Sequence, residues 1–217
     1  MDVVYFLAIA IGGYFLGGIN GALITSKLVY GEDVRDHGSG NAGLTNFYRT
    51  YGSRAIFLVI LIDILKTAAP VVLGGMLFES SLSFGTLSER VALGRIVGGL
   101  FAMLGHAYPP LYQFRGGKCV LSGGAMLLFL DLRVFGIIFL VFFFLVLLTR
   151  YISLGSISAG VLFPIMLALF GYSLLAICLA VLCGGLLVFR HRENITRLMQ
   201  KNERKISFGS KKGGSSA

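Results

Sequence analysis

The chain has 217 residues, of which 56% are hydrophobic and only 13% are charged, and its mean hydropathy is +0.83. About a quarter of the residues of an ordinary soluble domain are charged, and a soluble fold of this size could not hide so much apolar surface. The composition excludes intrinsic disorder, a coiled coil and a secreted disulfide scaffold, and the three cysteines form no disulfide framework. We expect an all-α, polytopic integral membrane protein.

Seven apolar segments recur along the chain with polar stretches between them. A helix that spans a bilayer needs about 20 apolar residues, with a range of about 17–25. One segment, at 120–130, is short and spans only if the bilayer thins there or its lead-in is buried in protein. The sequence predicts about seven transmembrane helices, over Val3–Ile24, Ala55–Phe78, Val91–Tyr112, Val120–Leu130, Val134–Leu148, Leu154–Phe170 and Tyr172–Phe189.

The distribution of positive charge sets the expected orientation. Of the net charge of +9, much is concentrated near the end of the chain, where eight of the 19 Lys and Arg residues lie between Arg190 and Lys212. This favours a cytoplasmic tail beside anionic lipid over a nucleic-acid groove. Seven spans place the termini on opposite sides, so we expect the N-terminus outside and the C-terminus inside. The N-terminal segment lacks the basic flank and cleavage site of a signal peptide, which predicts a retained helix.

This orientation puts three polar loops, 25–54, 105–122 and 149–156, on the cytoplasmic side together with the tail at 190–205. Nearly every residue type that performs chemistry lies in these stretches, so we expect the active site at that face. We predict one membrane domain over residues 1–205 and a disordered tail over 206–217.

The first polar loop combines glycines with side chains that donate hydrogen bonds. Glycines allow successive backbone N–H groups to point into one concavity that binds an anion, and Asn41 or Thr45 could cap a helix start. An arginine adds charge and two-pronged geometry. The alternative is an ordinary Gly-rich turn. The candidate anion ligands are Gly38, Ser39, Gly40, Asn41, Thr45, Asn46 and Arg49.

Charge inside the predicted spans is confined mainly to Asp63, Lys66 and Arg95. Because Asp63 and Lys66 are three residues apart, the two side chains can pair on one helix face.

The second polar loop places Gly116 and Gly117 directly before Lys118, which predicts exposed N–H groups beside a cation. The pattern is not a Walker A motif.

His106, taken alone, is better explained as a helix-end histidine with a structural hydrogen bond. Cys119 could be an acyl-accepting thiol, but a lone membrane cysteine is more often a small apolar filler.

Two further clusters complete the candidate site. Ser153 and Ser156 follow Arg150 and share a helix face, although serines in membrane helices usually bond to the backbone one turn back. His191, Asn194 and Arg197 fall on one face of a helix that leaves the membrane; a basic stop-transfer segment explains the arginines but not the His-x-x-Asn spacing.

The sequence contains no His-x-x-x-x-Asp acyltransferase pattern, no Gly-x-Ser-x-Gly elbow and no clustering typical of a zinc site.

Taken together, these stretches resemble the PlsY family of bacterial membrane glycerol-3-phosphate acyltransferases, which use acyl phosphate. The resemblance covers essentially the whole chain and implies seven spans with a cytoplasmic C-terminus. Some positions depart from the family pattern. Cys119, Leu121 and Ser122 stand where the family usually has glycine, alanine and threonine, Gly18 and Asn20 stand in its usual Gly-Ser-Ile-Pro, and Thr67 replaces a glycine.

The resemblance implies an acyltransferase that joins acyl phosphate and glycerol 3-phosphate in the cell membrane, acts as a monomer, and needs neither cofactor nor metal. The implied catalytic residues are Ser39, Arg49, Lys118, Ser153, His191 and Asn194. The implied ligands of the substrate phosphates are Gly38, Gly40, Asn41, Thr45, Asn46, Lys66, His106, Gly116, Gly117, Arg150, Ser156 and Arg197.

Two other functions stay open at this point. One is a diverged paralogue that binds lipid or phosphate with weak or no catalysis. The other is an anion transporter, which is less favoured because the polar residues gather on one face and do not line a path across the bilayer.

Overall fold

The computed structural model describes residues 2–81 and 85–206. All regular secondary structure in these ranges is helical, which confirms the predicted all-α class. The α-helices are α1 (Asp2–Gly17), α2 (Gly21–Tyr30), α3 (Leu44–Tyr51), α4 (Ile56–Ser81), α5 (Leu87–Ala107), α6 (Val120–Leu130), α7 (Leu132–Thr149), α8 (Ile152–Leu169), α9 (Leu174–Arg190) and α10 (Arg192–Met199). Two 3-10 helices, η1 (Val34–Asp36) and η2 (Pro110–Tyr112), lie in the loops.

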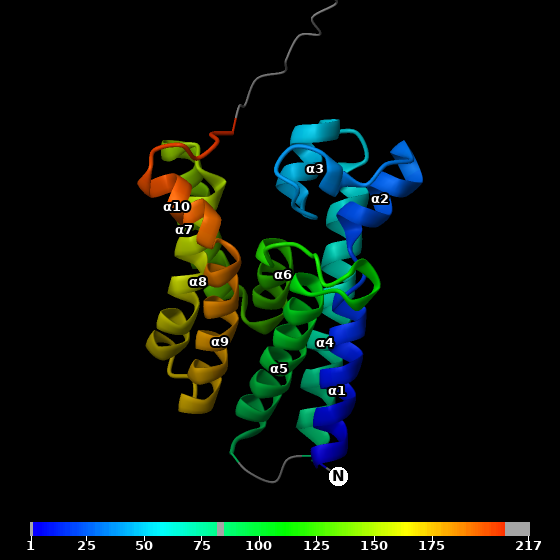
Figure 1. Cartoon of the computed structure of the whole chain (residues 1–217). Coiled ribbons are helices and arrows are strands. Elements are labelled where there is room, and N and C mark those ends of the chain that lie inside the picture. Colours follow the sequence, from blue (N-terminus) through cyan, green and yellow to red (C-terminus); the bar gives the residue numbers. More distant parts are fainter. Residues whose placement is uncertain (1, 82–84, 207–217) are drawn as a thin grey trace, which may run out of the picture.

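The long helices form a bundle with two unlike ends (Figure 1). The start of α1 lies at the lower end, whereas α2, α3 and α10 gather at the upper end. Helices α1, α4 and α5 pack together on one side and α7, α8 and α9 on the other, and α6 contacts helices of both groups. The loop between α5 and α6 lies lower in the bundle than α2 and α3.

Five helical segments within the described ranges are long and apolar enough to cross a membrane, and the first of them, Val3–Tyr30, consists of α1 and α2 together. The pair α9 and α10, bent by 58° where they meet, is a sixth candidate. Helix α6 matches the predicted short segment and has only 11 residues, too few to span a bilayer of ordinary thickness alone. The membrane-type helical bundle is therefore as predicted, while the number of seven spans and the orientation stay predictions.

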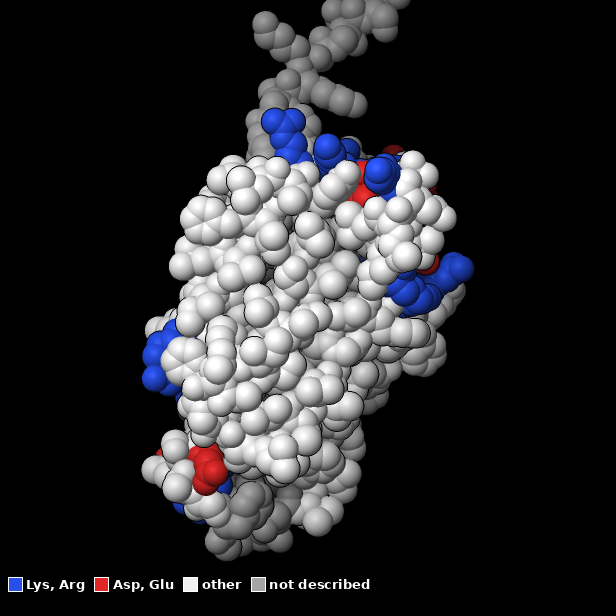
Figure 2. Space-filling view, turned by 90° about the vertical axis from the view of Figure 1, so that its left-hand side faces the viewer, with Lys and Arg blue, Asp and Glu red and all other residues white. Residues whose placement is uncertain are grey.

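The outer face of the α7–α8 side is suited to lipid. Figure 2 shows a broad central surface almost free of charged side chains, with Lys and Arg at the upper end and further charged residues at the lower left. Large apolar side chains of α7, among them Leu140, Phe144 and Leu148, are exposed on the surface. A contiguous exposed apolar face of this kind is unfavourable in water and is compatible with the hydrocarbon core of a bilayer.

The first predicted span, Val3–Ile24, falls within the candidate span Val3–Tyr30, but the helix is interrupted inside it. Helix α1 ends at Gly17, and α2 begins only at Gly21. Asn20 causes the interruption because its side chain caps α2, accepting a hydrogen bond from Leu23 N at 3.0 Å. The same amide donates to Ala42 O at 3.0 Å, which ties the break to the loop before α3.

The predicted tail lies outside the described residues except for Ile206. The backbone N–H of Ile206 donates to Arg150 O at 2.8 Å, so this part of the chain returns to the end of α7.

Candidate functional site

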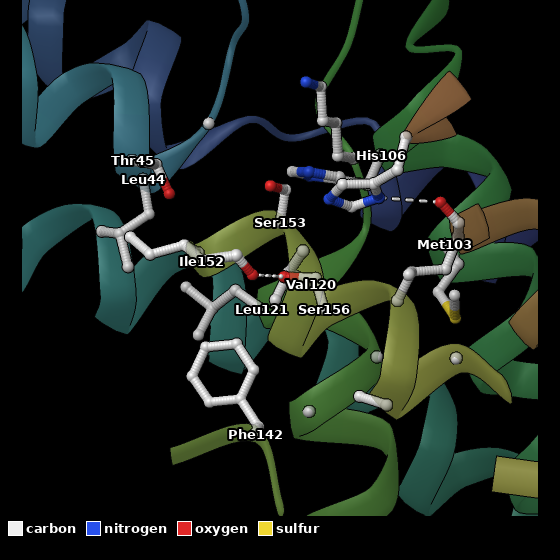
Figure 3. A pocket seen from close by; sticks show the side chains of 18 of the residues that line it. Leu44, Thr45, Met103, His106, Val120, Leu121, Phe142, Ile152, Ser153 and Ser156 are labelled. Carbon is white, nitrogen blue, oxygen red and sulfur yellow. Dashed lines mark hydrogen bonds between the residues drawn. The ribbon is translucent and has the colours of Figure 1, made fainter. Parts of the chain in front are cut away.

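A cavity of about 600 Å³ lies between the two groups of helices, with α3 and α10 at its upper end. Its walls differ in chemistry from one end to the other (Figure 3). Ser153 and His106 lie toward the polar end, and Leu121 and Phe142 lie below them among apolar side chains. The cavity therefore offers a polar, cationic compartment joined to an apolar one.

The six residues predicted to be catalytic all line this cavity, although they come from four different parts of the chain. Six of the predicted phosphate ligands also line it, and six others do not. Those in the wall are Asn41, Thr45, Asn46, His106, Ser156 and Arg197. Within residues 2–81 and 85–206, the wall does not include Gly38, Gly40, Lys66, Gly116, Gly117 or Arg150.

A buried carboxylate joins several of these side chains. Glu203 Oε1 accepts hydrogen bonds from Asn194 Nδ2 at 2.6 Å and from Ser153 Oγ at 2.9 Å. Its Oε2 accepts from Arg197 Nε at 2.8 Å, and Lys118 Nζ donates to Asn194 Oδ1 at 2.5 Å. Residues of the loop before α6, of α8 and of α10 are thus connected in one network.

The ionised form of Glu203 is stabilised where it lies. Burial raises the pKa of its carboxyl group, but hydrogen bonds from Arg197, Asn194 and Ser153 outweigh burial and hold the pKa below its usual value. Sequence reasoning missed Glu203. The only available signal is an acidic residue within a strongly basic segment, and this signal identifies no partner.

In the first loop, Asn46 has a structural task instead of the predicted ligand role. Its Oδ1 accepts from the backbone N and the hydroxyl of Ser39 at 2.8 and 3.1 Å. Its Nδ2 donates to Val34 O and His37 O at 2.9 and 3.0 Å. The amide of Asn46 is fully engaged in holding the loop, and it keeps Ser39 at the cavity wall.

The start of α3 is a better anion site than the glycine loop before it. Gly40 N donates to His37 O, so this N–H group does not face a ligand. The N-cap residue of α3 is Gly43, and no side chain among the described residues caps this helix. Asn41 and Thr45, the two candidate caps, therefore do not cap it. Leu44 and Thr45 line the cavity, so the uncapped N–H groups of the first turn lie beside it.

The Gly-Gly loop also differs from its prediction. Gly116 N donates to Ala107 O at 3.3 Å and Gly117 N donates to His106 O at 3.0 Å. These two N–H groups are therefore bonded to the end of α5 and do not form a phosphate nest. The next residue, Lys118, is the part of this loop that reaches the cavity.

The ammonium group of Lys118 is readily deprotonated for a lysine. Burial lowers the pKa of Lys118 to about 8; Arg197 and Arg190 act in the same direction, and Glu193 and Glu203 oppose them. Lys118 is thus mostly charged at neutral pH and becomes neutral in mildly alkaline solution.

Cys119 has the properties of a packed side chain and not of a nucleophile. Its thiol is fully buried, donates to Met103 O at 3.2 Å and does not belong to the cavity wall formed by the described residues. Burial raises the pKa of Cys119 to about 12, so the thiolate is scarce at neutral pH. The backbone φ of 64° is in the left-handed region, where a residue with a side chain is strained.

The predicted pair of Asp63 and Lys66 is present in the structure. Lys66 Nζ lies 2.7 Å from Asp63 Oδ1 and 2.7 Å from His106 Nδ1. Because an ammonium group only donates, His106 Nδ1 accepts, and the ring proton is on Nε2. Lys66 is thus engaged beneath the site and is not positioned to contact a ligand in the cavity.

His191 has a fixed tautomer. Its Nδ1 lies 2.8 Å from Leu187 O, and a carbonyl only accepts, so Nδ1 carries the proton and Nε2 keeps the lone pair. Burial lowers the pKa of His191 to about 4, which leaves the ring neutral at pH 7. Such a ring can accept a proton at Nε2.

The remaining predicted residues have separate roles. Ser156 Oγ donates to Ile152 O at 2.9 Å, the backbone bond that is common for serine in membrane helices (Figure 3). Arg150 ends α7 with a left-handed φ of 62°, is exposed, and contributes its carbonyl to the contact with Ile206. Arg49 NH2 donates to Arg204 O at 3.2 Å across the mouth of the cavity.

Comparisons with known proteins give a consistent assignment. The family model for glycerol-3-phosphate acyltransferase matches residues 7–201. The chain is 40% identical over 202 residues to glycerol-3-phosphate acyltransferase 2 of a Bacillus cereus strain, covering 91% of this chain and 93% of the relative. It is 34% identical over 205 residues to the glycerol-3-phosphate acyltransferase of Carboxydothermus hydrogenoformans, covering 94% and 97%.

Two solved structures are similar along nearly the whole chain. The glycerol 3-phosphate form of the integral membrane acyltransferase PlsY (YgiH) matches with a TM-score of 0.82 and 33% identity, covering 93% of this chain and 96% of that one. The lysophosphatidic acid form matches with a TM-score of 0.78 and 32% identity, covering 93% and 95%.

The Glu203 network predicts a change in stability. Glu203→Gln removes the charge that Arg197 and Asn194 bind and places an amide N–H₂ among donors, so it should destabilise the fold by about 1–3 kcal/mol. The measurement is the melting temperature in detergent, together with the rate of trypsin cleavage after Arg204. Glu193→Gln is the matched control, because the Glu193 side chain is 70% exposed. Equal melting temperatures for the two variants would contradict the role of Glu203.

Proposed function

The chain belongs to the glycerol-3-phosphate acyltransferase family, and we propose that it moves a fatty acyl group from an acyl phosphate to the 1-hydroxyl of glycerol 3-phosphate, giving lysophosphatidic acid. The observation that carries this proposal is a continuous cavity with a cationic end and an apolar end. We place the protein in the bacterial plasma membrane, with the polar end of the cavity at the cytoplasmic face.

The polar end suits two phosphate groups. Two dianions repel each other strongly at short range, so a site that brings them together needs positive charge. Arg49, Lys118 and Arg197 line this end, and the uncapped first turn of α3 adds oriented N–H groups. Positioning and electrostatic stabilisation by these groups would supply most of the rate enhancement.

The apolar end suits the fatty acyl chain. Its wall includes Met126 of α6, Phe142 of α7 and Phe163 of α8. Phe163 follows Ser153 by ten residues, so the compartment extends about 15 Å along α8 from the polar end. An acyl chain held there stays out of water while its activated carbonyl reaches the cationic groups.

The chemistry needs no covalent enzyme intermediate. An acyl phosphate is already activated, so the 1-hydroxyl oxygen attacks the carbonyl carbon directly, and the bond from that carbon to the phosphate oxygen breaks. His191 Nε2 is one acceptor for the hydroxyl proton, and the departing phosphate is another. The uncapped first turn of α3 lines the cavity and offers N–H donors to a carbonyl oxyanion.

The test is the reaction of purified protein with glycerol 3-phosphate and different acyl donors. Palmitoyl phosphate should give lysophosphatidic acid, detected by mass spectrometry, without added metal. Palmitoyl thioesters are the comparison donors, and product from them alone would overturn the choice of acyl phosphate. Binding of both substrates without turnover would indicate a diverged binding protein instead.

The lowered pKa of Lys118 predicts how the reaction depends on pH. Its ammonium form should bind phosphate, so kcat/KM should fall as the pH rises through about 8, the pKa of the free enzyme. Lys118→Arg should remove this alkaline limb because arginine stays charged, and Lys118→Ala should lose at least about tenfold in kcat/KM. A wild-type profile in either variant would contradict the assignment.

Cys119→Gly should keep or raise the rate. Glycine relieves the strain of a φ of 64° and leaves the backbone free to approach a ligand, and no thiol chemistry is lost. The measurement is initial velocity at saturating acyl phosphate, with mass spectrometry for acylated cysteine; the control is Cys178→Ser, whose side chain is exposed. An inactive Cys119→Gly protein together with a trapped acyl-Cys119 adduct would require a two-step mechanism.

Gly124 offers a test of the acyl compartment. It lines the cavity, and apart from its chain neighbours and the nearby backbone of α6, no described heavy atom lies within 4 Å of a Cβ built there. Gly124→Leu should therefore fill part of the compartment without a clash and lower the rate with palmitoyl phosphate at least about tenfold more than with octanoyl phosphate. Gly136→Leu is the control, because Gly136 has the same free space but is not among the described wall residues. Equal effects on both donors would place the acyl chain elsewhere.

A further inference from the structure

We propose that Arg190 is a positioning residue, which holds the Gly116–Gly117 loop so that Lys118 is presented to the phosphate compartment. The inference rests on the proposed function of the cavity. Arg190 is the last residue of α9, whereas the loop follows α5 and η2. The contact between them connects the two groups of helices beside the site.

The guanidinium group binds two successive carbonyls of the loop. Arg190 Nε donates to Gly117 O at 3.1 Å, and NH2 donates to Gly116 O at 3.1 Å. Two parallel donors in a rigid plane define the orientation of the peptide groups they bind, which a single donor does not do. The carbonyl edge of the loop is thus fixed by α9.

The opposite edge of the same loop is fixed by α5. Gly116 N and Gly117 N donate to Ala107 O and His106 O. The fit is also sterically tight: a Cβ at Gly117 would lie 2.1 Å from His106 Nε2. With both edges of two successive residues bonded, the direction in which the chain enters Lys118 is determined by these contacts and not by Lys118 itself.

The flat face of the Arg190 guanidinium group packs against the Tyr108 ring. Its guanidinium carbon lies 5.1 Å from the centre of the Tyr108 ring, and Tyr108 O accepts from Tyr14 OH at 2.7 Å. Among the described residues, none of the ion pairs includes Arg190. Its positive charge is therefore not neutralised locally, and it adds to the field that a phosphate group meets near Lys118.

A simpler role for an arginine at the end of a membrane helix is to anchor that helix at the lipid headgroups. Arg192 is the arginine that fits this role, because its side chain is exposed and stacks on Phe189, three residues earlier in the chain. Arg190 is directed the other way, toward the loop. The two arginines, two residues apart, form a matched pair for experiment.

The experiment compares Arg190→Gln with Arg190→Lys and Arg192→Gln in the full chain. In Arg190→Gln, we expect KM for at least one phosphate substrate to rise about tenfold or more while kcat changes less than about threefold, since the reacting groups stay in place. Arg190→Lys keeps the charge but replaces the planar guanidinium group with a single point donor, so its KM should lie between the values of the wild type and Arg190→Gln. Arg192→Gln should match the wild type in both constants.

A second readout does not depend on turnover. Arg190 is one of the charges that lower the pKa of Lys118, together with Arg197 and against Glu193 and Glu203. Lys118 can be reductively ¹³C-methylated and titrated by NMR, with Lys118→Arg identifying its signal. The titration midpoint should rise in Arg190→Gln and stay unchanged in Arg190→Lys and Arg192→Gln.

The outcomes separate this inference from the proposed function. If the wild type is inactive with every acyl donor, the proposed function fails, and the Lys118 titration still decides whether Arg190 acts on this loop. If Arg190→Gln lowers the melting temperature but leaves KM and the Lys118 midpoint at wild-type values, Arg190 is only structural and the inference is overturned.

Discussion

The polar half of the cavity depends on one buried negative charge. Ser153, Asn194 and Arg197 all donate to the Glu203 carboxylate. Donors that are buried without an acceptor cost free energy, and cations packed together repel one another. Glu203 meets both needs, so a cluster of cations strong enough to bind phosphate can exist before any phosphate arrives. The fold therefore carries its own counter-charge beside the site.

This arrangement explains why the predicted catalytic side chains come from distant parts of the sequence. The two groups of helices meet where α5 packs against α9 and where α6 contacts helices of both groups. Arg190 binds the backbone carbonyls of the loop before α6, and Lys118 of that loop donates to the side chain of Asn194 in α10. The candidate site thus lies where the two groups of helices are joined by charged hydrogen bonds, which are stronger and more directional than apolar contacts.

Sequence reasoning was most successful where residue type alone limits the outcome. Long apolar segments fold as helices because a bilayer leaves few other choices. Lys118 and His191, which were predicted to be catalytic, line one cavity, since a membrane fold has few other places for charged and polar residues. The failures concern pairing. The N–H group of Gly116 and the Nδ2 donor of Asn46 have the right chemistry for an anion, but Gly116 N donates to Ala107 O and Asn46 Nδ2 donates to Val34 O and His37 O. Spacing along the chain does not reveal such partners.

The shortness of α6 has a consequence for how the substrates meet. Because α6 has 11 residues and follows a loop that lies lower than α2 and α3, Lys118 sits inside the bundle and not on its surface. In the proposed reaction, water-soluble glycerol 3-phosphate must reach this level, while the fatty acyl chain remains among the helices throughout. The lipid chain is then never drawn into water, a transfer that costs about 0.8 kcal/mol for each methylene. The single-chain product forms at the depth from which it can pass sideways into the leaflet.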